Sequence, residues 1–168
     1  MMTRGEIIKI LKKHDVFASF IGVMIHDYEH PGYSNSFIVR TKHPLATRYS
    51  DISVLENHHL AAAFTVLFTW PKCNIMENMP YELQLETRSI IIDMVLNSDI
   101  SKHFTLMTAF KTKLGNNLNT ESMEDRTLIL SVTLRIVSSF KTVRDRHIFY
   151  KWMEKFFDEF FKQGDMEK

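Results

Sequence analysis

The scarcity of helix-breaking residues constrains the fold of this chain more than any other feature of its sequence. Only 5 Gly and 4 Pro occur in 168 residues, so there are few places for the tight turns that join many short strands. Apolar residues recur instead at steps of one, three and four, which is typical of helices with one buried face. We therefore predict an all-α fold of roughly seven or eight helices.

The clearest helical pattern lies near the C-terminal end, at residues 148–161. There an apolar stripe faces away from a charged stripe, which predicts an amphipathic helix whose apolar face packs in a core or an interface. The apolar stripe consists of Ile148, Phe149, Trp152, Met153, Phe156, Phe157, Phe160 and Phe161. Weaker patterns of the same kind predict helices over 89–96, 104–110 and 128–137.

Two polar stretches, 74–80 and 112–124, predict connections between helices. Thr120 or Ser122 is expected to cap the helix that follows the second stretch, because a hydroxyl can accept a hydrogen bond from the first free backbone amides of a helix.

Charge and cysteine content exclude several classes of function. Lys plus Arg (21) and Asp plus Glu (20) nearly cancel, so we expect no nucleic-acid partner. The single cysteine, Cys73, cannot form an internal disulfide and favours a reducing compartment. No apolar run is long enough to span a membrane and no signal peptide is recognised, so we expect no membrane partner. The sequence predicts one cytoplasmic domain, 1–168, with a cytoskeletal or ciliary assembly as an alternative location.

The most informative polar residues lie between 26 and 60. The adjacent His26 and Asp27 can offer an imidazole and a carboxylate to one metal ion. Nearby Glu and His side chains could order metal-bound waters or neutralise a phosphate. Pro31 and Gly32 are expected to end a helix directly after this cluster and to leave it at a cavity mouth. Taken alone, however, a His-Asp pair is more often a helix-end pair that binds no metal.

Several segments together carry a resemblance to a known family. They read HDYEHPGYSN at 26–35, DISVLENHHLA at 51–61, IDMVLNSDISKH at 92–103, KW at 151–152 and EFFKQGD at 159–165. In this order they resemble the signature of the class I 3′,5′-cyclic-nucleotide phosphodiesterase catalytic domain, and the resemblance covers residues 15–168. It implies a compact all-α multi-helix domain of the HD-domain or PDEase-like kind.

The resemblance also implies a chemistry and its residues. The family hydrolyses cAMP or cGMP to the 5′-monophosphate with zinc and, usually, magnesium. By resemblance, His26 and Asp27 are metal ligands and His30 lies near the phosphate. The groups expected around the second metal or in the pocket lining are Glu56, His59, Asp99 and Asn35. The alternative is that Glu56, Asp99 and His30 form a buried hydrogen-bond network without metal, and that His58 and His59 are satisfied polar groups on a packed helix.

Three departures from the family pattern bear on activity. The family's upstream His-Asn-x-x-His motif is not found in the 25 residues that precede His26, and His14 is too close to His26 to replace it. Ser138 stands where the resemblance requires a zinc-binding Asp, and a serine cannot donate an anionic oxygen. The sequence also stops at Lys168, before the family's final helices, which hold the purine-binding glutamine and an aromatic clamp.

We therefore expect a truncated, degenerate family member that lacks the family's first and last helices and has no resident cofactor. It is expected to be catalytically inactive and to serve as a structural or regulatory subunit of a larger assembly. Its expected partners are other protein chains, bound through exposed apolar helix faces such as Phe156–Phe161. The alternative is a fragment of an active enzyme that hydrolyses cAMP or cGMP with zinc and magnesium. The Ser138 substitution is internal, so truncation does not explain it, and this favours the inactive subunit.

Overall fold

The computed structural model describes residues 6–116, 118–139 and 145–168, and within these ranges it contains helices and connections but no strand. The elements in chain order are the 3₁₀ helix η1 (Glu6–Ile10), α1 (Lys13–Ile25), α2 (Asn35–Arg40), α3 (Pro44–Arg48), α4 (Val54–Thr69), α5 (Tyr81–Leu96), the 3₁₀ helix η2 (Ile100–Lys102), α6 (His103–Gly115), α7 (Met123–Ser139) and α8 (Arg146–Met166). The all-α prediction is confirmed.

The predicted helical patterns all fall inside observed helices. The segments 89–96, 104–110, 128–137 and 148–161 lie in α5, α6, α7 and α8. The predicted connection 74–80 is confirmed, since it joins α4 to α5. The polar stretch 112–124 was placed too early, because α6 continues to Gly115. Its last turn carries Lys113, whose Nζ lies 2.7 Å from Asp125 Oδ1 on α7, so a polar residue there stabilises the packing of two helices.

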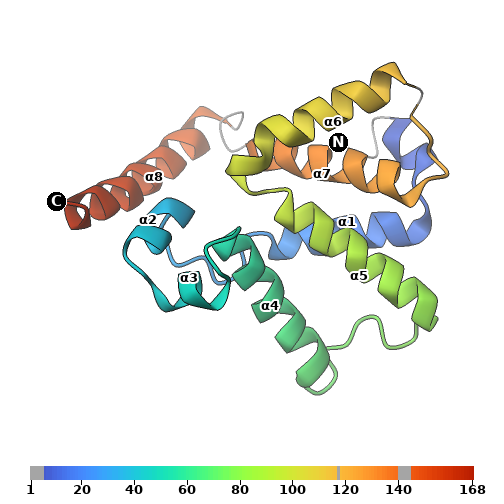
Figure 1. Ribbon diagram of the computed structural model, residues 1–168, viewed down its shortest axis with the longest axis horizontal. Coiled ribbons are helices and arrows are strands. Elements are labelled where there is room, and N and C mark those ends of the chain that lie inside the picture. The colour runs from blue at the N-terminus through green and yellow to red at the C-terminus, as the bar shows by residue number, and fades with distance from the viewer. Residues whose placement is uncertain (1–5, 117, 140–144) are drawn as a thin grey trace.

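The main core forms where α1, α5 and α7 pack against one another (Figure 1). Gly22 of α1 lies against Met94 of α5, and a Cβ there would stand 3.4 Å from Met94 Cε, in ordinary van der Waals contact. Helix α4 adds Leu60 and Phe64 to the same core. The buried apolar residues of this core are Ala18, Ile21, Leu60, Phe64, Met76, Ile90, Ile91, Met94, Val95, Leu130 and Leu134.

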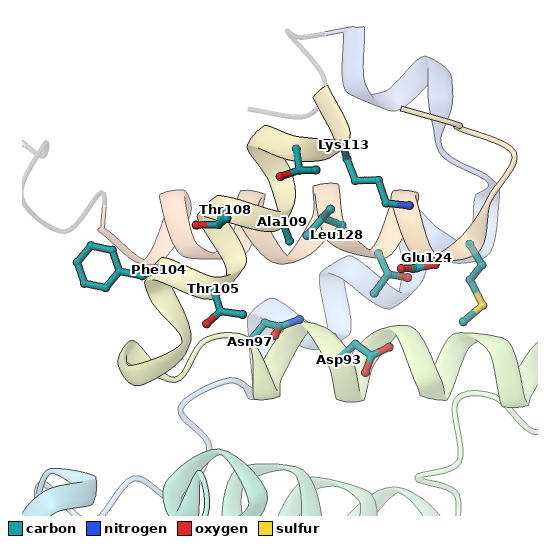
Figure 2. A pocket seen from close by; sticks show the side chains of 12 residues that line it. Asp93, Asn97, Phe104, Thr105, Thr108, Ala109, Lys113, Glu124 and Leu128 are labelled. Carbon is teal, nitrogen blue, oxygen red and sulfur yellow. The ribbon is translucent and has the colours of Figure 1, made fainter. Parts of the chain in front are cut away.

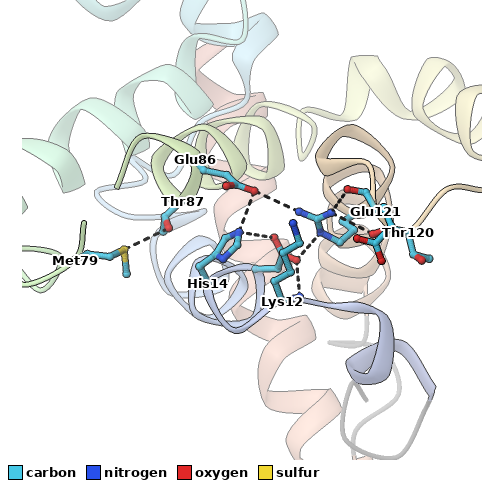
Figure 3. A network of polar contacts seen from close by, with 9 residues as sticks. Lys12, His14, Met79, Glu86, Thr87, Thr120 and Glu121 are labelled. Carbon is cyan, nitrogen blue, oxygen red and sulfur yellow. Dashed lines mark hydrogen bonds and ion pairs between the residues drawn. The ribbon is translucent and has the colours of Figure 1, made fainter. Parts of the chain in front are cut away.

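A buried ion pair crosses this core. Arg126 of α7 and Asp15 of α1 are both 0% exposed, and Arg126 Nε donates to Asp15 Oδ2 at 2.7 Å (Figure 3). The same guanidinium donates from Nη1 to the carbonyl oxygens of Thr120 and Glu121, at 3.1 and 2.7 Å. Because these carbonyls lie just before α7, the bonds help to fix where the helix begins. Of the two predicted caps, Ser122 is the residue that directly precedes the helix.

A smaller apolar cluster holds α2, α3 and the start of α4 together. Its buried members are Ile38, Ala46, Val54 and Leu55. Just before α4, Ser50, Asp51 and Ser53 have φ values of 53°, 63° and 42°, a region that costs about 1–3 kcal/mol for a residue other than glycine. Ser53 is held in this conformation because its Oγ donates to Asp99 Oδ2 at 2.8 Å. The start of α4 is thereby tied to the segment that follows α5.

Helix α8 differs from the other long helices because none of its residues is buried. It extends away from the α1–α5–α7 core (Figure 1) and touches the segment around α2, where Ser34 N donates to Gln163 Oε1 at 2.9 Å. The four phenylalanines of its second half, Phe156, Phe157, Phe160 and Phe161, are 48 to 69% exposed. Even this helix, with 21 residues, is not apolar enough to cross a membrane, and no other described helix qualifies.

Candidate functional site

The turn that follows α1 holds the predicted metal pair, His26 and Asp27. Helix α1 ends at Ile25 with His26 as its C-terminal cap, so the prediction that residues 31–32 would end the helix is wrong. Residues 26–29 form a turn instead, in which Tyr28 N donates to Ile25 O at 2.9 Å and Glu29 adopts a left-handed φ of 57°. The pair therefore lies in an irregular turn and not on a helical face.

One hydrogen bond orients the His26 ring. Its Nδ1 lies 2.7 Å from Val23 O, and since a carbonyl only accepts, Nδ1 carries the hydrogen. Its Nε2 is buried, finds no hydrogen-bond partner among the described residues and lies 3.3 Å from Asp27 Oδ2. An imidazole that donates one ring hydrogen to a backbone carbonyl and keeps the other nitrogen available is the usual arrangement of a metal-binding histidine.

The first turns of α4 bring His59 to the same place. His59 is 2% exposed, its Nδ1 lies 2.6 Å from Tyr28 O, and its ring stacks on that of His30 with centroids 5.6 Å apart. Burial lowers the pKa of His59 to about 4, against the opposing effect of the Tyr28 bond. His59 is therefore neutral at pH 7. Its neighbour His58 instead pairs with Glu29 through an Nε2–Oε2 distance of 3.3 Å, as expected of a polar group on a packed helix.

Glu56 also faces this region, and Asn35 holds it. Asn35 Nδ2 donates to Glu56 Oε2 at 2.9 Å, and Asn35 Oδ1 accepts from Leu55 N at 2.9 Å. Burial raises the pKa of Glu56, and the Asn35 bond opposes that rise. Asn35 was predicted to line the pocket. The structure places it as a bridge between the start of α2 and the first turn of α4.

Asp99 has a different surrounding from the one that the resemblance implied. Its carboxylate is satisfied at both oxygens: Oδ2 accepts from Ser53 Oγ and Oδ1 from Ser101 N, each at 2.8 Å. Burial alone would raise the pKa of Asp99, but these bonds outweigh it and hold the pKa below its ordinary value. Asp99 caps η2 and does not belong to the cavity wall described next.

A cavity of about 230 Å³ unites most of the predicted site residues. It is lined by His26, Asp27, His30, Leu55, Glu56, His59, Ser98 and Ser138. The turn after α1, the start of α4, the segment after α5 and the end of α7 all contribute to it. Sequence reasoning missed Ser98, although this residue lies inside the motif segment 92–103 and directly precedes Asp99.

Ser138 reaches the cavity from the last turn of α7. Its Oγ donates to Arg135 O at 2.9 Å, so the hydroxyl is already engaged within its own helix. Among the described residues, no three metal-binding side chains that include His26 have ligand atoms within 4.8 Å of one another. Catalytic zinc usually needs three protein ligands. The one imidazole and one carboxylate of the His26–Asp27 pair do not meet that requirement by themselves, and the other His and Glu side chains that line the cavity do not complete a compact group with them.

A larger cavity of about 850 Å³ lies elsewhere, between α5, α6 and α7 (Figure 2). Asp93 of α5 and Asn97, which caps that helix, line one side, and Thr105 and Ala109 of α6 face them. Desolvation raises the pKa of Asp93, while Lys102 lowers it. This cavity contains none of the predicted site residues, so size does not identify the site that the sequence points to.

Comparisons with known proteins agree with this architecture. The family model of the 3′5′-cyclic nucleotide phosphodiesterases matches residues 1–168. The chain is 35% identical over 161 residues to 3′,5′-cyclic-AMP phosphodiesterase 4C of Rattus norvegicus and 34% identical over 154 residues to the high affinity cGMP-specific 3′,5′-cyclic phosphodiesterase 9A of Pan troglodytes. These matches cover 92% of the chain but 30% and 26% of the relatives.

Solved structures give the same result. The phosphodiesterase domain of the RhoPDE fusion protein from the choanoflagellate Salpingoeca rosetta superimposes with a TM-score of 0.87 at 29% identity. The match covers 94% of this chain and 50% of that domain. The chain therefore belongs to the cyclic-nucleotide phosphodiesterase family, whose members depend on metal ions. It spans less than a third of the length of the two relatives named above. The extent of the domain, 1–168, stays a prediction.

Proposed function

We propose that this chain does not hydrolyse cyclic nucleotides by itself and serves as a structural or regulatory subunit of a larger assembly. Ser138 carries this proposal. The cavity beside His26 and Asp27 presents a neutral hydroxyl where the family resemblance requires a carboxylate, and that hydroxyl is already bonded to Arg135 O. A neutral oxygen cannot offset the charge of a divalent cation in a partly buried site.

The remaining polar groups have roles that need no metal. Asn35 joins the start of α2 to the Glu56 side chain and the Leu55 amide of α4, and Ser53 and Ser101 satisfy the Asp99 carboxylate. A buried network in which every polar side chain has a hydrogen-bond partner holds the helices in register. These contacts support the alternative that the sequence left open, in which part of the ancestral site persists as a structural network.

The second candidate is a fragment of an active enzyme for cAMP or cGMP. Two observations favour it: the chain spans half of the solved phosphodiesterase domain, and the buried His26 Nε2 finds no hydrogen-bond partner among the described residues. In this case zinc and magnesium would be bound at His26 and Asp27, together with ligands from another part of the assembly. The family's metal dependence supports the candidate, and Ser138 opposes it.

Hydrolysis assays separate the two candidates. We expect the purified chain, supplied with Zn²⁺ and Mg²⁺, to convert neither cAMP nor cGMP faster than a His26→Ala/Asp27→Ala double variant does. We also expect Ser138→Asp to strengthen metal binding at His26, while the uncharged control Ser138→Asn does not. Turnover by the wild-type chain that disappears in the double variant would overturn the proposal and establish the active fragment.

The subunit role rests on α8. Its phenylalanines form an exposed apolar surface, in which the rings of Phe156 and Phe160 lie 4.4 Å apart and those of Phe157 and Phe161 lie 6.1 Å apart. Exposed apolar surfaces that continue over several residues mark protein contacts. Aromatic side chains are also enriched where interfaces are strongest. We therefore assign this surface, Phe156–Phe161, to another protein chain of the assembly.

A pair of matched double variants tests this assignment. Phe157→Ser/Phe161→Ser removes two apolar rings, and Lys155→Ser/Lys162→Ser removes two charges from the same helix. We expect the wild-type chain and the lysine variant, isolated without denaturant, to elute in a complex with a fixed ratio of partner chains. The phenylalanine variant should elute alone. A wild-type chain that elutes alone, with its apolar surface still exposed, would contradict the subunit role while leaving the hydrolysis result unaffected.

A further inference from the structure

A second cluster of metal-binding residue types lies at the opposite end of α1 from His26. The first turn of α1 carries His14 and Asp15, and the neighbouring helix α5 contributes Glu86 (Figure 3). His14 Nε2 lies 3.0 Å from Glu86 Oε1 and 3.4 Å from Asp15 Oδ1. All three ligand atoms lie within 4.8 Å of one another. Among the described residues, no other group of three His, Cys, Asp or Glu side chains has its ligand atoms this close together.

Two atoms of this cluster lack the hydrogen bonds that buried polar atoms normally make. His14 and Asp15 side chains are 10% and 0% exposed, and neither His14 Nε2 nor Asp15 Oδ1 has a hydrogen-bond partner among the described residues. The short distance from His14 to Glu86 does not meet hydrogen-bond geometry at the ring nitrogen. An unsatisfied buried donor or acceptor costs about 1–3 kcal/mol. One cation that both atoms coordinate would satisfy them. The third candidate ligand atom, Glu86 Oε1, accepts from Arg126 Nη2 at 3.3 Å.

The surrounding contacts leave these two atoms available. The other oxygen of Asp15, Oδ2, accepts from Arg126 Nε and from Lys12 N, each at 2.7 Å. Arg126 is itself fixed by the carbonyls of Thr120 and Glu121. The carboxylate of Asp15 is therefore rigidly oriented, with Oδ1 turned toward His14. Partners that orient a ligand in this way normally accompany a metal site.

Charge and geometry favour a small divalent ion. With a neutral imidazole, the charges of Asp15, Glu86 and Arg126 sum to −1, so a cation offsets an excess of negative charge. Zinc binds imidazole nitrogen and carboxylate oxygen at about 2.0–2.2 Å, which places two ligands of one ion about 3–4 Å apart. The measured separations of 3.0 and 3.4 Å fall in that range. One imidazole with two carboxylates is a donor set that zinc and cobalt accept.

We propose that His14, Asp15 and Glu86 form a binding site for one zinc-type divalent ion that ties α1 to α5. The site is separate from the cavity beside His26, and it does not depend on the proposed function. Since the ligands come from two helices, a bound ion would stabilise the packing of α1 against α5.

Cobalt binding tests this site with a direct spectroscopic signal. The probe is Co²⁺, followed by displacement with Zn²⁺, and the protein is the His26→Ala/Asp27→Ala variant, so that the other cavity cannot contribute. We expect one equivalent of Co²⁺ with visible d–d absorption, and a higher thermal midpoint in its presence. Adding Glu86→Gln should weaken binding by roughly 100-fold or more, because a direct ligand matters at least as much as the groups that orient it.

The matched control is Glu82→Gln, which removes the same charge from an exposed position of α5; it should bind Co²⁺ as tightly as its parent. His14→Gln provides a second loss of a ligand if circular dichroism shows that it folds. If it does not fold, Zn²⁺ titration of the wild-type chain should shift the His14 imidazole signals in NMR spectra. Binding that is absent in the parent, or that Glu86→Gln leaves unchanged, would overturn the proposal and leave an ion network only.

Discussion

Helix α7 has the weaker apolar stripe but is largely buried, whereas helix α8 has the stronger stripe but is exposed. Helix α7 has 17 residues, of which nine are buried, and these include the charged Asp125 and Arg126. Helix α8 has 21 residues with the more regular apolar stripe, and none of them is buried. Burial follows from what packs against a helix, so a strong stripe alone does not place a helix in the core of its own chain.

The comparison also separates two kinds of stabilisation. Helix α7 contributes Leu130 and Leu134 to the core and holds α1 through the Arg126–Asp15 pair. Helix α8 is attached to the rest of the chain by polar contacts near its C-terminal end, such as the bond from Ser34 N to Gln163. We therefore expect mutations in α7 to change folding, and mutations in α8 to change association.

The largest expected effect is at the buried ion pair. Arg126→Ala leaves Asp15 as an uncompensated buried charge and should lower the free energy of unfolding by about 3–5 kcal/mol. Arg146→Ala, on the exposed start of α8, should change it by less than about 0.5 kcal/mol. Urea titrations followed by circular dichroism measure both. Equal effects of the two variants would show that the pair in α7 is not buried as described.

The next effect compares two apolar residues. Leu130 is 0% exposed in the core and Phe160 is 57% exposed on α8. Leu130→Ala should cost about 2–5 kcal/mol, whereas Phe160→Ala should cost less than about 1 kcal/mol in the isolated chain. Thermal and urea unfolding at several protein concentrations would reveal an exception. A large, concentration-dependent cost for Phe160→Ala would mean that α8 packs against a second copy of the chain.

The smallest effect is the pH dependence of stability that comes from His59, a buried residue that is neutral at pH 7. Folded His59 binds a proton only near pH 4, whereas the ordinary value is 6.5. The unfolded state therefore takes up more protons between these values, so the stabilisation is complete above pH 6.5 and is lost as the pH falls toward 4. Between pH 7 and pH 5 the loss should be about 2 kcal/mol.

His59→Gln tests this pH dependence, since glutamine does not titrate and can still donate to Tyr28 O. We expect the variant to lose about 2 kcal/mol less than the wild-type chain between pH 7 and pH 5. The measurement is the difference in urea unfolding free energy at the two pH values. An identical loss in both proteins would show that other histidines account for the acid sensitivity.

Much of the candidate site was predictable because its residues occur in continuous motifs. His26, Asp27, His30, Glu56 and His59 were predicted together and line one cavity. Their metal and phosphate roles stay predictions. The end of α1 was predicted wrongly, because the helix already gives way at His26 to a turn over residues 26–29, before Pro31–Gly32 is reached.

By itself the sequence determined the helical class and the family. Helical periodicity and ordered motifs are local properties of a chain, so both can be recognised without knowing which helices pack together. Only the tertiary structure decided which apolar stripe is buried, since that depends on neighbouring helices. It also paired Arg126 with Asp15, 111 residues away, made Asp99 a cap, and brought Ser138 to the cavity beside His26. Contacts of this kind join distant segments, and the energy of each depends on burial that no single segment can provide.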